Sequence, residues 1–286
     1  MHTLSTPPLI SAADLATRLA AGGPPPVLLD CSFDLADPAA GRRAYRAAHL
    51  PGAVYADLDT DLSGAKTGRN GRHPLPARAD LAATAGRWGI APGRLVVACD
   101  GQGGMYAARA WWLLLWLGHA EVQVLDGGLP AWQAAGGALE AGDGPAPEAT
   151  APPYPAAKAL VATLDADALQ AGLGRVVLLD ARAPDRFRGE VEPLDARAGH
   201  IPGARNHFFR NNLQHDGRFR PATELQAAFD AYGQPPAHVV HQCGSGVTAC
   251  HNLLAMAVAG RHGALLYPGS WSEWSADPAR PVAVGG

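Results

Sequence analysis

The stretch VLLDC at residues 27–31 returns as VLLDA at residues 177–181. At nearly the same spacing, HLPGA at residues 49–53 is matched by HIPGA at residues 200–204. Matching segments in the same order at one spacing indicate an internal repeat, so the chain is predicted to hold a tandem duplication. A third pair in the same order is formed by LVVACDG at residues 95–101 and HVVHQCG at residues 238–244.

Within each repeat, short β-branched runs alternate with apolar-periodic segments of helix length. The runs include residues 27–29, 95–97 and 122–125, and the helical segments include residues 106–117 and 248–259. Runs that are apolar on both faces suit a parallel sheet covered by helices. We therefore predict an α/β fold with two domains, each a mostly parallel sheet flanked by helices. Ligands of such sheets bind beyond the carboxyl ends of the strands.

A proline-rich stretch divides the two repeats. Residues 141–157 read AGDGPAPEATAPPYPAA, which is typical of a stiff, extended linker. The length of 286 residues also suits two domains at roughly 150 residues each. We predict a first domain over residues 1–142, a linker over residues 143–158 and a second domain over residues 159–286.

Composition excludes several classes of protein. With 48% hydrophobic and 17% charged residues the chain can bury a core, and its net charge of −3 without a run of basic residues argues against nucleic acid or an anionic membrane as partner. The most apolar stretch, residues 110–117, is too short to span a bilayer, and the N-terminus lacks the pattern of a secretory leader. We expect a cytoplasmic protein. No Cys-x-x-Cys pair suggests zinc, and we expect neither a metal nor a cofactor.

The segment CGSGVT at residues 243–248 stands between a predicted strand at residues 239–241 and a predicted helix at residues 249–259. Its two glycines allow a tight turn in which successive N–H groups point inward, and a helix N-terminus adds positive potential. Such a loop favours a thiolate and binds an anion, so Cys243 is the candidate nucleophile. The alternative is a buried core thiol, which is how we interpret Cys31, Cys99 and Cys250.

A nucleophilic cysteine in an anion-binding loop indicates either a phosphatase or a sulfur carrier. A Cys-x5-Arg phosphatase needs an arginine six residues after the cysteine to bind phosphate through two hydrogen bonds, but residue 249 is Ala. The loop is also one residue short for that purpose, whereas a persulfide needs only converging N–H donors. The sequence therefore favours sulfur transfer.

On these motifs, together with GSWSEW at residues 269–274, the chain resembles the tandem rhodanese-family sulfurtransferases from about Leu9 to Val284. The resemblance implies two rhodanese-like domains with one active site in the cleft between them. It implies a catalytically silent first domain, with Asp100 at the position equivalent to Cys243. The acceptor of sulfur would be cyanide or a thiol, for example that of a thioredoxin-like protein.

The loop composition resembles the relatives that use 3-mercaptopyruvate as sulfur donor. Thiosulfate-using relatives carry Arg and Lys directly after the cysteine, where this chain has Gly244 and Ser245. The resemblance thus implies that 3-mercaptopyruvate loads a Cys243 persulfide and leaves as pyruvate. The N–H groups of the loop would hold that persulfide; the loop residues concerned are Gly244, Ser245, Gly246, Val247 and Thr248. Two alternatives stay open: a thiosulfate sulfurtransferase, and a non-catalytic persulfide carrier or binding module.

Further site residues follow from the same resemblance. Arg186 is expected to bind the donor carboxylate. A second arginine often follows a Glu-Pro pair in such enzymes, but Glu192-Pro193 is followed by Leu194, so Arg197 is the candidate for that role.

By the same resemblance, Ser245 and His49 are the candidate catalytic helpers, with His49 expected to face the loop serine across the cleft and to move a proton. Trp271 is expected to form a wall of the site.

Overall fold

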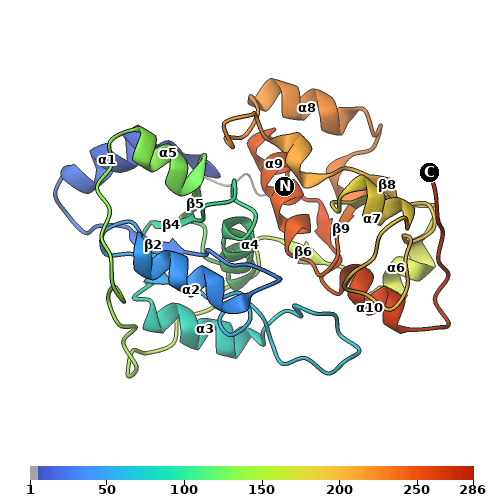
Figure 1. Ribbon diagram of the computed structural model, residues 1–286, viewed down its shortest axis with the longest axis horizontal. Coiled ribbons are helices and arrows are strands. Elements are labelled where there is room, and N and C mark those ends of the chain that lie inside the picture. The colour runs from blue at the N-terminus through green and yellow to red at the C-terminus, as the bar shows by residue number, and fades with distance from the viewer. Residues whose placement is uncertain (1–5) are drawn as a thin grey trace.

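A computed structural model describes residues 6–286, which form two lobes of like architecture (Figure 1). The first lobe holds a five-stranded sheet in the order β1-β5-β4-β2-β3, and the second holds one in the order β6-β10-β9-β7-β8. Every pairing in both sheets is parallel. The strands are β1 (Leu9–Ile10), β2 (Val27–Asp30), β3 (Val54–Tyr55), β4 (Val96–Cys99), β5 (Val122–Leu125), β6 (Ala162–Thr163), β7 (Val177–Asp180), β8 (Arg205–Asn206), β9 (Val239–Gln242) and β10 (Leu265–Leu266).

Helices cover both sheets. Those of the first lobe are α1 (Ala12–Ala20), α2 (Pro38–Ala47), α3 (Arg78–Arg87), α4 (Ala107–Leu117) and α5 (Gly128–Ala134). Those of the second are α6 (Ala166–Gly172), α7 (Pro184–Arg188), η1 (Phe209–Asn212), α8 (Ala222–Asp230), η2 (Pro236–His238), α9 (Thr248–Val258) and α10 (Ser270–Ala276). Because the strand order of one lobe repeats in the other, the predicted duplication and the α/β fold with parallel sheets are confirmed.

The lobes meet along α4 and α9, the two helices that follow the central strands. Nearly every residue of α4 is buried, from Ala107 to Leu117. One hydrophobic cluster runs without interruption from β2 and α4 of the first lobe to α9 of the second. The lobes therefore share a core, and α4 and α9 fix how the ends of β4 and β9 face one another.

The linker is irregular but anchored. The backbone N–H groups of Tyr154 and Ala157 donate to carbonyl oxygens of the first lobe at 2.8 and 3.0 Å, as does that of Leu160, just after the linker, at 3.0 Å, and Tyr154 is buried. The linker thus lies along the first lobe. The domain boundaries at residues 142 and 159 stay predictions.

Each lobe sends a loop across to the other. The loop between β3 and α3 of the first lobe brings His73 to Ser245 of the second, with Nδ1 2.7 Å from Oγ. The loop between β8 and α8 of the second lobe brings the Phe219 N–H to Asp126 of the first, at 2.9 Å. The first lobe thus contacts the loop after β9, and the second lobe contacts the turn after β5. The loop after β4 is also contacted by the second lobe, because His251 Nε2 lies 3.0 Å from the Gly103 carbonyl oxygen.

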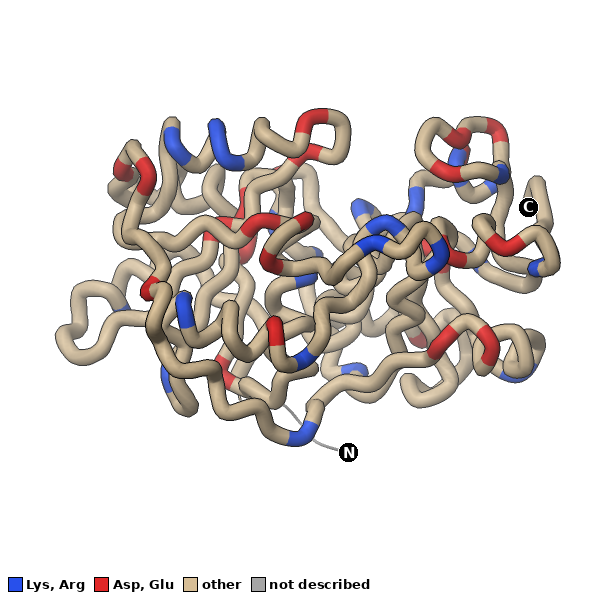
Figure 2. The backbone as a smooth tube through the Cα atoms, turned by 90° about the horizontal axis from the view of Figure 1, so that it is seen from below, with Lys and Arg blue, Asp and Glu red and all other residues tan. Residues whose placement is uncertain are grey.

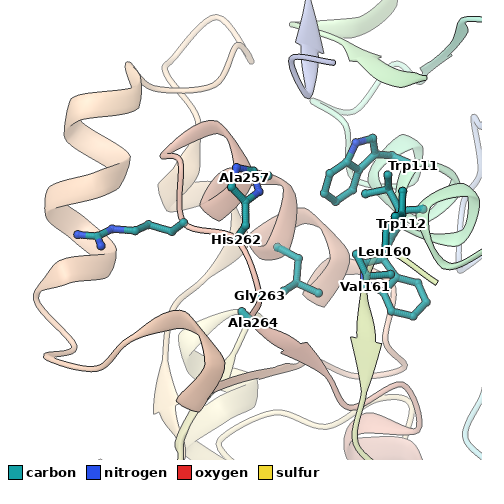
Figure 3. Close-up of a pocket in the computed structure, with 11 residues that line it drawn as sticks. Trp111, Trp112, Leu160, Val161, Ala257, His262, Gly263 and Ala264 are labelled. Carbon is teal, nitrogen blue, oxygen red and sulfur yellow. The ribbon is translucent and has the colours of Figure 1, made fainter. Parts of the chain in front are cut away.

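An apolar cavity of about 130 Å³ also lies between the lobes, lined by residues of α4, of α9 and of the segment directly before β6, which include Trp111, Trp112 and Val161 (Figure 3). Charged residues of both signs are interspersed over the two lobes (Figure 2). Within residues 6–286, no helix has both the length and the apolar character needed to cross a membrane. The same residues include no group of three or more His, Cys, Asp or Glu side chains placed to hold a metal ion.

Candidate active site

Cys243 stands directly after β9, at the start of a loop that closes around its sulfur. The N–H groups of Ser245 and Gly246 point at Sγ from 3.4 and 3.1 Å. The side chain is only 2% exposed. A sulfur anion at this place would therefore be held by backbone donors out of bulk water.

The loop that carries Cys243 is held by hydrogen bonds to the start of α10. The N–H of Cys243 donates to Ser270 Oγ at 3.1 Å, and the Trp271 N–H donates to the Cys243 carbonyl at 3.0 Å. Gly246 has a φ of 78°, and a Cβ there would lie 2.4 Å from the Pro268 carbonyl oxygen. Only glycine suits that position, because it alone meets both the backbone angle and the lack of space.

The equivalent loop of the first lobe holds a carboxylate in place of the thiol. Asp100 follows β4 as Cys243 follows β9. Its two oxygens accept four backbone N–H groups at 2.8–2.9 Å, those of Gln102, Gly104, Tyr106 and Ala107. The first lobe therefore keeps the anion-binding loop but fills it with its own side chain.

His73 reaches the site from the loop between β3 and α3. Its Nδ1 lies 2.7 Å from Ser245 Oγ, and its Nε2 lies 3.6 Å from Asp59 Oδ1. Burial, with a smaller contribution from the charge of Arg109, lowers the pKa of His73 to about 3. The ring is thus neutral near pH 7 and can exchange a proton with the serine hydroxyl.

Two arginines, one from each lobe, lie beside the Cys243 loop. Arg186, in α7, donates from Nη2 to Glu192 at 2.6 Å and lies 3.3 Å from Asp195. Arg72, directly before His73, pairs with the other oxygen of Asp195. Both line a cavity of about 180 Å³ that opens on Cys243. Its other lining residues are Leu35, Met105, Tyr106, Ala181, Arg182, Ala183, Phe208, Phe209, Gly244, Ser245, Val247 and Thr248.

Arg109 is a buried cation that contacts the Cys243 loop. It is the one charged residue of α4 and is fully buried, and its guanidinium donates to carbonyl oxygens of both lobes: Gly246 at 3.3 Å and His73 at 3.1 Å. It thereby ties the Cys243 loop to the segment that carries His73. Sequence analysis missed this role, although a single arginine in an otherwise apolar helix was a sign of it.

His49 is a correction to the sequence analysis, because it does not face the loop serine. Its Nδ1 lies 2.7 Å from the Tyr45 carbonyl oxygen, its Nε2 lies 3.1 Å from Glu140, and its ring stacks on Tyr45. The duplicate His200 makes the same type of contact, with the Phe187 carbonyl oxygen at 2.8 Å. Both histidines brace a repeated turn, and His73 occupies the place expected for His49.

Arg197 and Trp271 are also corrections, because neither lines the cavity. Every guanidinium nitrogen of Arg197 donates to a backbone carbonyl oxygen in residues 274–280, so this arginine fastens α10 and the segment after it. Trp271 is fully buried and donates from its indole nitrogen to the Arg197 carbonyl at 2.9 Å. Trp271 supports the loop through its backbone hydrogen bond to Cys243, and it does not form a wall of the site.

The remaining predicted residues are brought together. Cys243, Gly244, Ser245, Val247, Thr248 and Arg186 line the cavity, and Gly246 donates to the sulfur. The other three cysteines are buried and do not line the cavity, although the Cys250 thiol donates to the Gly246 carbonyl oxygen at 3.2 Å. Burial raises the pKa of Cys31 and Cys99 well above the ordinary value, and that of Cys250 to about 12, so these thiols stay protonated near pH 7.

The sequence matches the family described as "Rhodanese-like domain" twice, over residues 11–135 and 165–277. The chain belongs to the rhodanese family. This rhodanese-family chain is 50% identical over 288 residues to a Pseudomonas aeruginosa protein named "Probable 3-mercaptopyruvate sulfurtransferase", and the match covers 99% of the chain and 100% of that relative. It is 32% identical to the thiosulfate sulfurtransferase of Gallus gallus, with 93% and 92% covered.

Among solved structures, the rhodanese-family chain matches the 3-mercaptopyruvate sulfurtransferase from Leishmania major with a TM-score of 0.82 and 32% identity. The match covers 95% of this chain and 75% of that chain. Membership of the family, with named sulfurtransferases as relatives over nearly its whole length, makes this chain an enzyme of the sulfurtransferase class.

Proposed function

We propose that the protein transfers sulfur from 3-mercaptopyruvate to a thiol or to cyanide through a persulfide on Cys243, and releases pyruvate. The observation that carries the proposal is the pair of N–H groups, from Ser245 and Gly246, that point at Sγ of the buried Cys243. Donors in that arrangement stabilise the anionic outer sulfur of a persulfide.

In the first half-reaction the Cys243 thiolate attacks the sulfur of the donor. A sulfur–sulfur bond forms, and the carbon–sulfur bond breaks with its electron pair passing to carbon as pyruvate enolate. The proton that begins on the donor thiol ends on the methyl group of pyruvate. The neutral His73, 2.7 Å from Ser245 Oγ, supports a relay of that proton through the serine hydroxyl.

In the second half-reaction an acceptor removes the outer sulfur. Cyanide attacks it, the sulfur–sulfur bond breaks, thiocyanate leaves and Cys243 returns to a thiolate. A thiolate acceptor reacts in the same way and leaves as a persulfide. We include a thioredoxin-like thiol among the acceptors and a cytoplasmic location, where thiols stay reduced.

The absence of charged side chains directly after Cys243 favours 3-mercaptopyruvate over thiosulfate as the sulfur donor. The residues that follow it, Gly244 and Ser245, carry no charge, and Arg186 lines the cavity where a single carboxylate would bind. Thiosulfate remains the second candidate donor, because Arg72 and Arg186 together place two cations near the sulfur.

The test is the ratio of kcat/KM for 3-mercaptopyruvate to kcat/KM for thiosulfate, measured with cyanide as the common acceptor. The proposal expects a ratio well above one. A ratio below one makes the protein a thiosulfate sulfurtransferase. A protein that is loaded once but does not turn over with either donor is a persulfide carrier, which contradicts the proposal.

A further inference from the structure

The apolar cavity between the lobes is separate from the cavity of Cys243. Helices of both lobes line it, α4 with Trp111, Trp112 and Leu115, and α9 with Leu253 and Ala257. The rest of its lining comes from the segments directly before β6 and β10. No residue lines both cavities. A ligand in this cavity would therefore touch both lobes without touching the residues around the nucleophile.

The size and lining of the cavity suit one aromatic ring. Its volume is about 130 Å³. Apolar cavities of roughly 150 Å³ stay dry and bind benzene, because water finds too few polar partners in them. Trp111, Trp112 and Leu115 are at most 2% exposed, so the buried end of the cavity offers two indole rings and one aliphatic side chain. Aromatic rings pack favourably against such a surface.

Two tryptophans in the lining have unused hydrogen-bond donors. The indole N–H groups of Trp111 and Trp112 are buried, and neither has an acceptor within residues 6–286. Three other buried tryptophans, Trp132, Trp271 and Trp274, donate to backbone carbonyl oxygens at 2.8, 2.9 and 2.8 Å. Because buried indole donors ordinarily find a partner, the unpaired donors favour a ligand that brings an acceptor oxygen.

His262 adds a polar group to the side of the cavity opposite Trp111 (Figure 3). Partial burial lowers the pKa of His262 from its ordinary value, so the ring is neutral near pH 7 and can accept a proton from a hydroxyl group in a hydrogen bond. Among the described residues that line the cavity none is acidic, and Arg261 already pairs with Asp230. The lining thus suits a neutral ligand better than an ion.

We propose that this cavity binds a neutral, one-ring aromatic molecule that carries a hydroxyl group, a ligand of the phenol class. The ring packs against the indoles of α4 and the aliphatic side chains of α9. The hydroxyl oxygen accepts from an indole N–H, and the hydroxyl proton is donated to His262. The inference does not rest on the proposed function, because no residue of the Cys243 cavity takes part in it.

Titration calorimetry of the intact protein with phenol tests the proposal. We expect a Kd of about 0.1–1 mM, as a ligand of this size allows. Benzene should bind about three- to tenfold more weakly, because it lacks the hydrogen-bonding oxygen. Benzoate should bind at least about tenfold more weakly than phenol, because its charge would have to be buried. Absence of phenol binding at about 10 mM overturns the proposal, and so does an affinity for benzene or benzoate equal to that for phenol.

Variants that fill the cavity locate the bound phenol. Ala257→Leu places a larger side chain in the cavity from α9, and it should lower the affinity for phenol by about tenfold or more. Ala227→Leu, a matched change at an exposed position of α8, should leave the affinity within about twofold of wild type. Ala264→Val fills the cavity from another segment and guards against a folding defect in Ala257→Leu. Wild-type affinity in either filling variant overturns the proposal.

Competition with the sulfur donor separates the two cavities. Phenol at about ten times its Kd should leave KM for 3-mercaptopyruvate within about twofold, and Cys243→Ser should bind phenol as wild type does. Because the ligand binds the folded protein, the same concentration should raise Tm by about 2–4 °C. Competitive inhibition by phenol would place it in the Cys243 cavity and overturn the proposal. A protein that binds phenol as expected but does not turn over 3-mercaptopyruvate contradicts the proposed function alone.

Discussion

At the scale of single residues, Arg186 and its neighbour Arg188 provide a matched pair. Arg186 lines the cavity of Cys243, whereas Arg188 pairs with the exposed Glu190 at 2.7 Å. A charge-assisted bond to a carboxylate contributes about 1.5–3 kcal/mol, so Arg186→Ala should lower kcat/KM for 3-mercaptopyruvate by about tenfold to a hundredfold. Arg188→Ala should leave that constant unchanged. Steady-state kinetics of both variants checks the prediction, and equal constants would remove Arg186 from the site.

His73 allows a test of the proton relay at the same scale. Its ring contacts Ser245 and is neutral, because burial lowers its pKa to about 3. Release of pyruvate needs a proton on carbon, whereas release of sulfite from thiosulfate does not. His73→Asn should therefore slow loading by 3-mercaptopyruvate about a hundredfold and slow loading by thiosulfate much less. Stopped-flow loading with the two donors measures the difference, and an equal slowing of both would assign His73 a structural role.

At the scale of elements, the sequence predicts those helices and strands whose formation depends on the local pattern of apolar residues. The helices expected at residues 106–117 and 248–259 are α4 and α9. The apolar run at residues 27–29 lies in β2, and the run at residues 95–97 overlaps the start of β4. Periodicity and the repeat suffice for these elements. The Cys243 loop is equally local, because its glycines and the following helix fix its shape.

β9 carries a buried histidine that makes stability depend on pH. Burial lowers the pKa of His241 to about 3, from 6.5 in a solvated histidine, and its Nδ1 has no hydrogen-bond partner among residues 6–286. As the pH falls below 6.5 the unfolded chain takes up a proton that the folded chain does not, so this residue destabilises the fold increasingly toward pH 3.

Replacement of that residue isolates the effect. His241→Leu removes the titrating group, so the free energy of unfolding of wild type should fall relative to the variant by about 1.4 kcal/mol per pH unit between about pH 6 and pH 4. Urea unfolding at several pH values measures that difference. A difference that stays constant with pH would show that His241 is not buried as a neutral ring.

At the scale of the whole molecule, the two lobes build one site by exchanging loops. His73 and Arg72 come from the loop between β3 and α3, and Arg109 comes from α4, yet all three lie near a nucleophile of the second lobe. Sequence patterns do not show which loop of one repeat crosses to the other. For this reason His49, a repeated turn residue, was chosen in error for the place that His73 occupies.

Arg109 tests how strongly the lobes depend on one another. Its guanidinium bonds carbonyl oxygens of both lobes and is fully buried, so Arg109→Leu removes these buried hydrogen bonds and should lower the free energy of unfolding by about 3 kcal/mol or more. Arg43→Leu, which removes an exposed pair with Asp37, should leave the urea midpoint unchanged. Equal midpoints for Arg109→Leu and wild type would show that the buried guanidinium does not join the lobes.

The most direct test of the account is the mass of the protein after reaction with 3-mercaptopyruvate in the absence of acceptor. We expect the intact protein to gain one sulfur atom, one pyruvate to be released for each sulfur bound, and peptide analysis to locate the sulfur on Cys243. Added cyanide should restore the original mass, and Cys243→Ser should gain no sulfur, whereas Cys250→Ser should gain it as wild type does. Protein that turns over 3-mercaptopyruvate without a sulfur on Cys243, or turnover that persists in Cys243→Ser, would contradict the account.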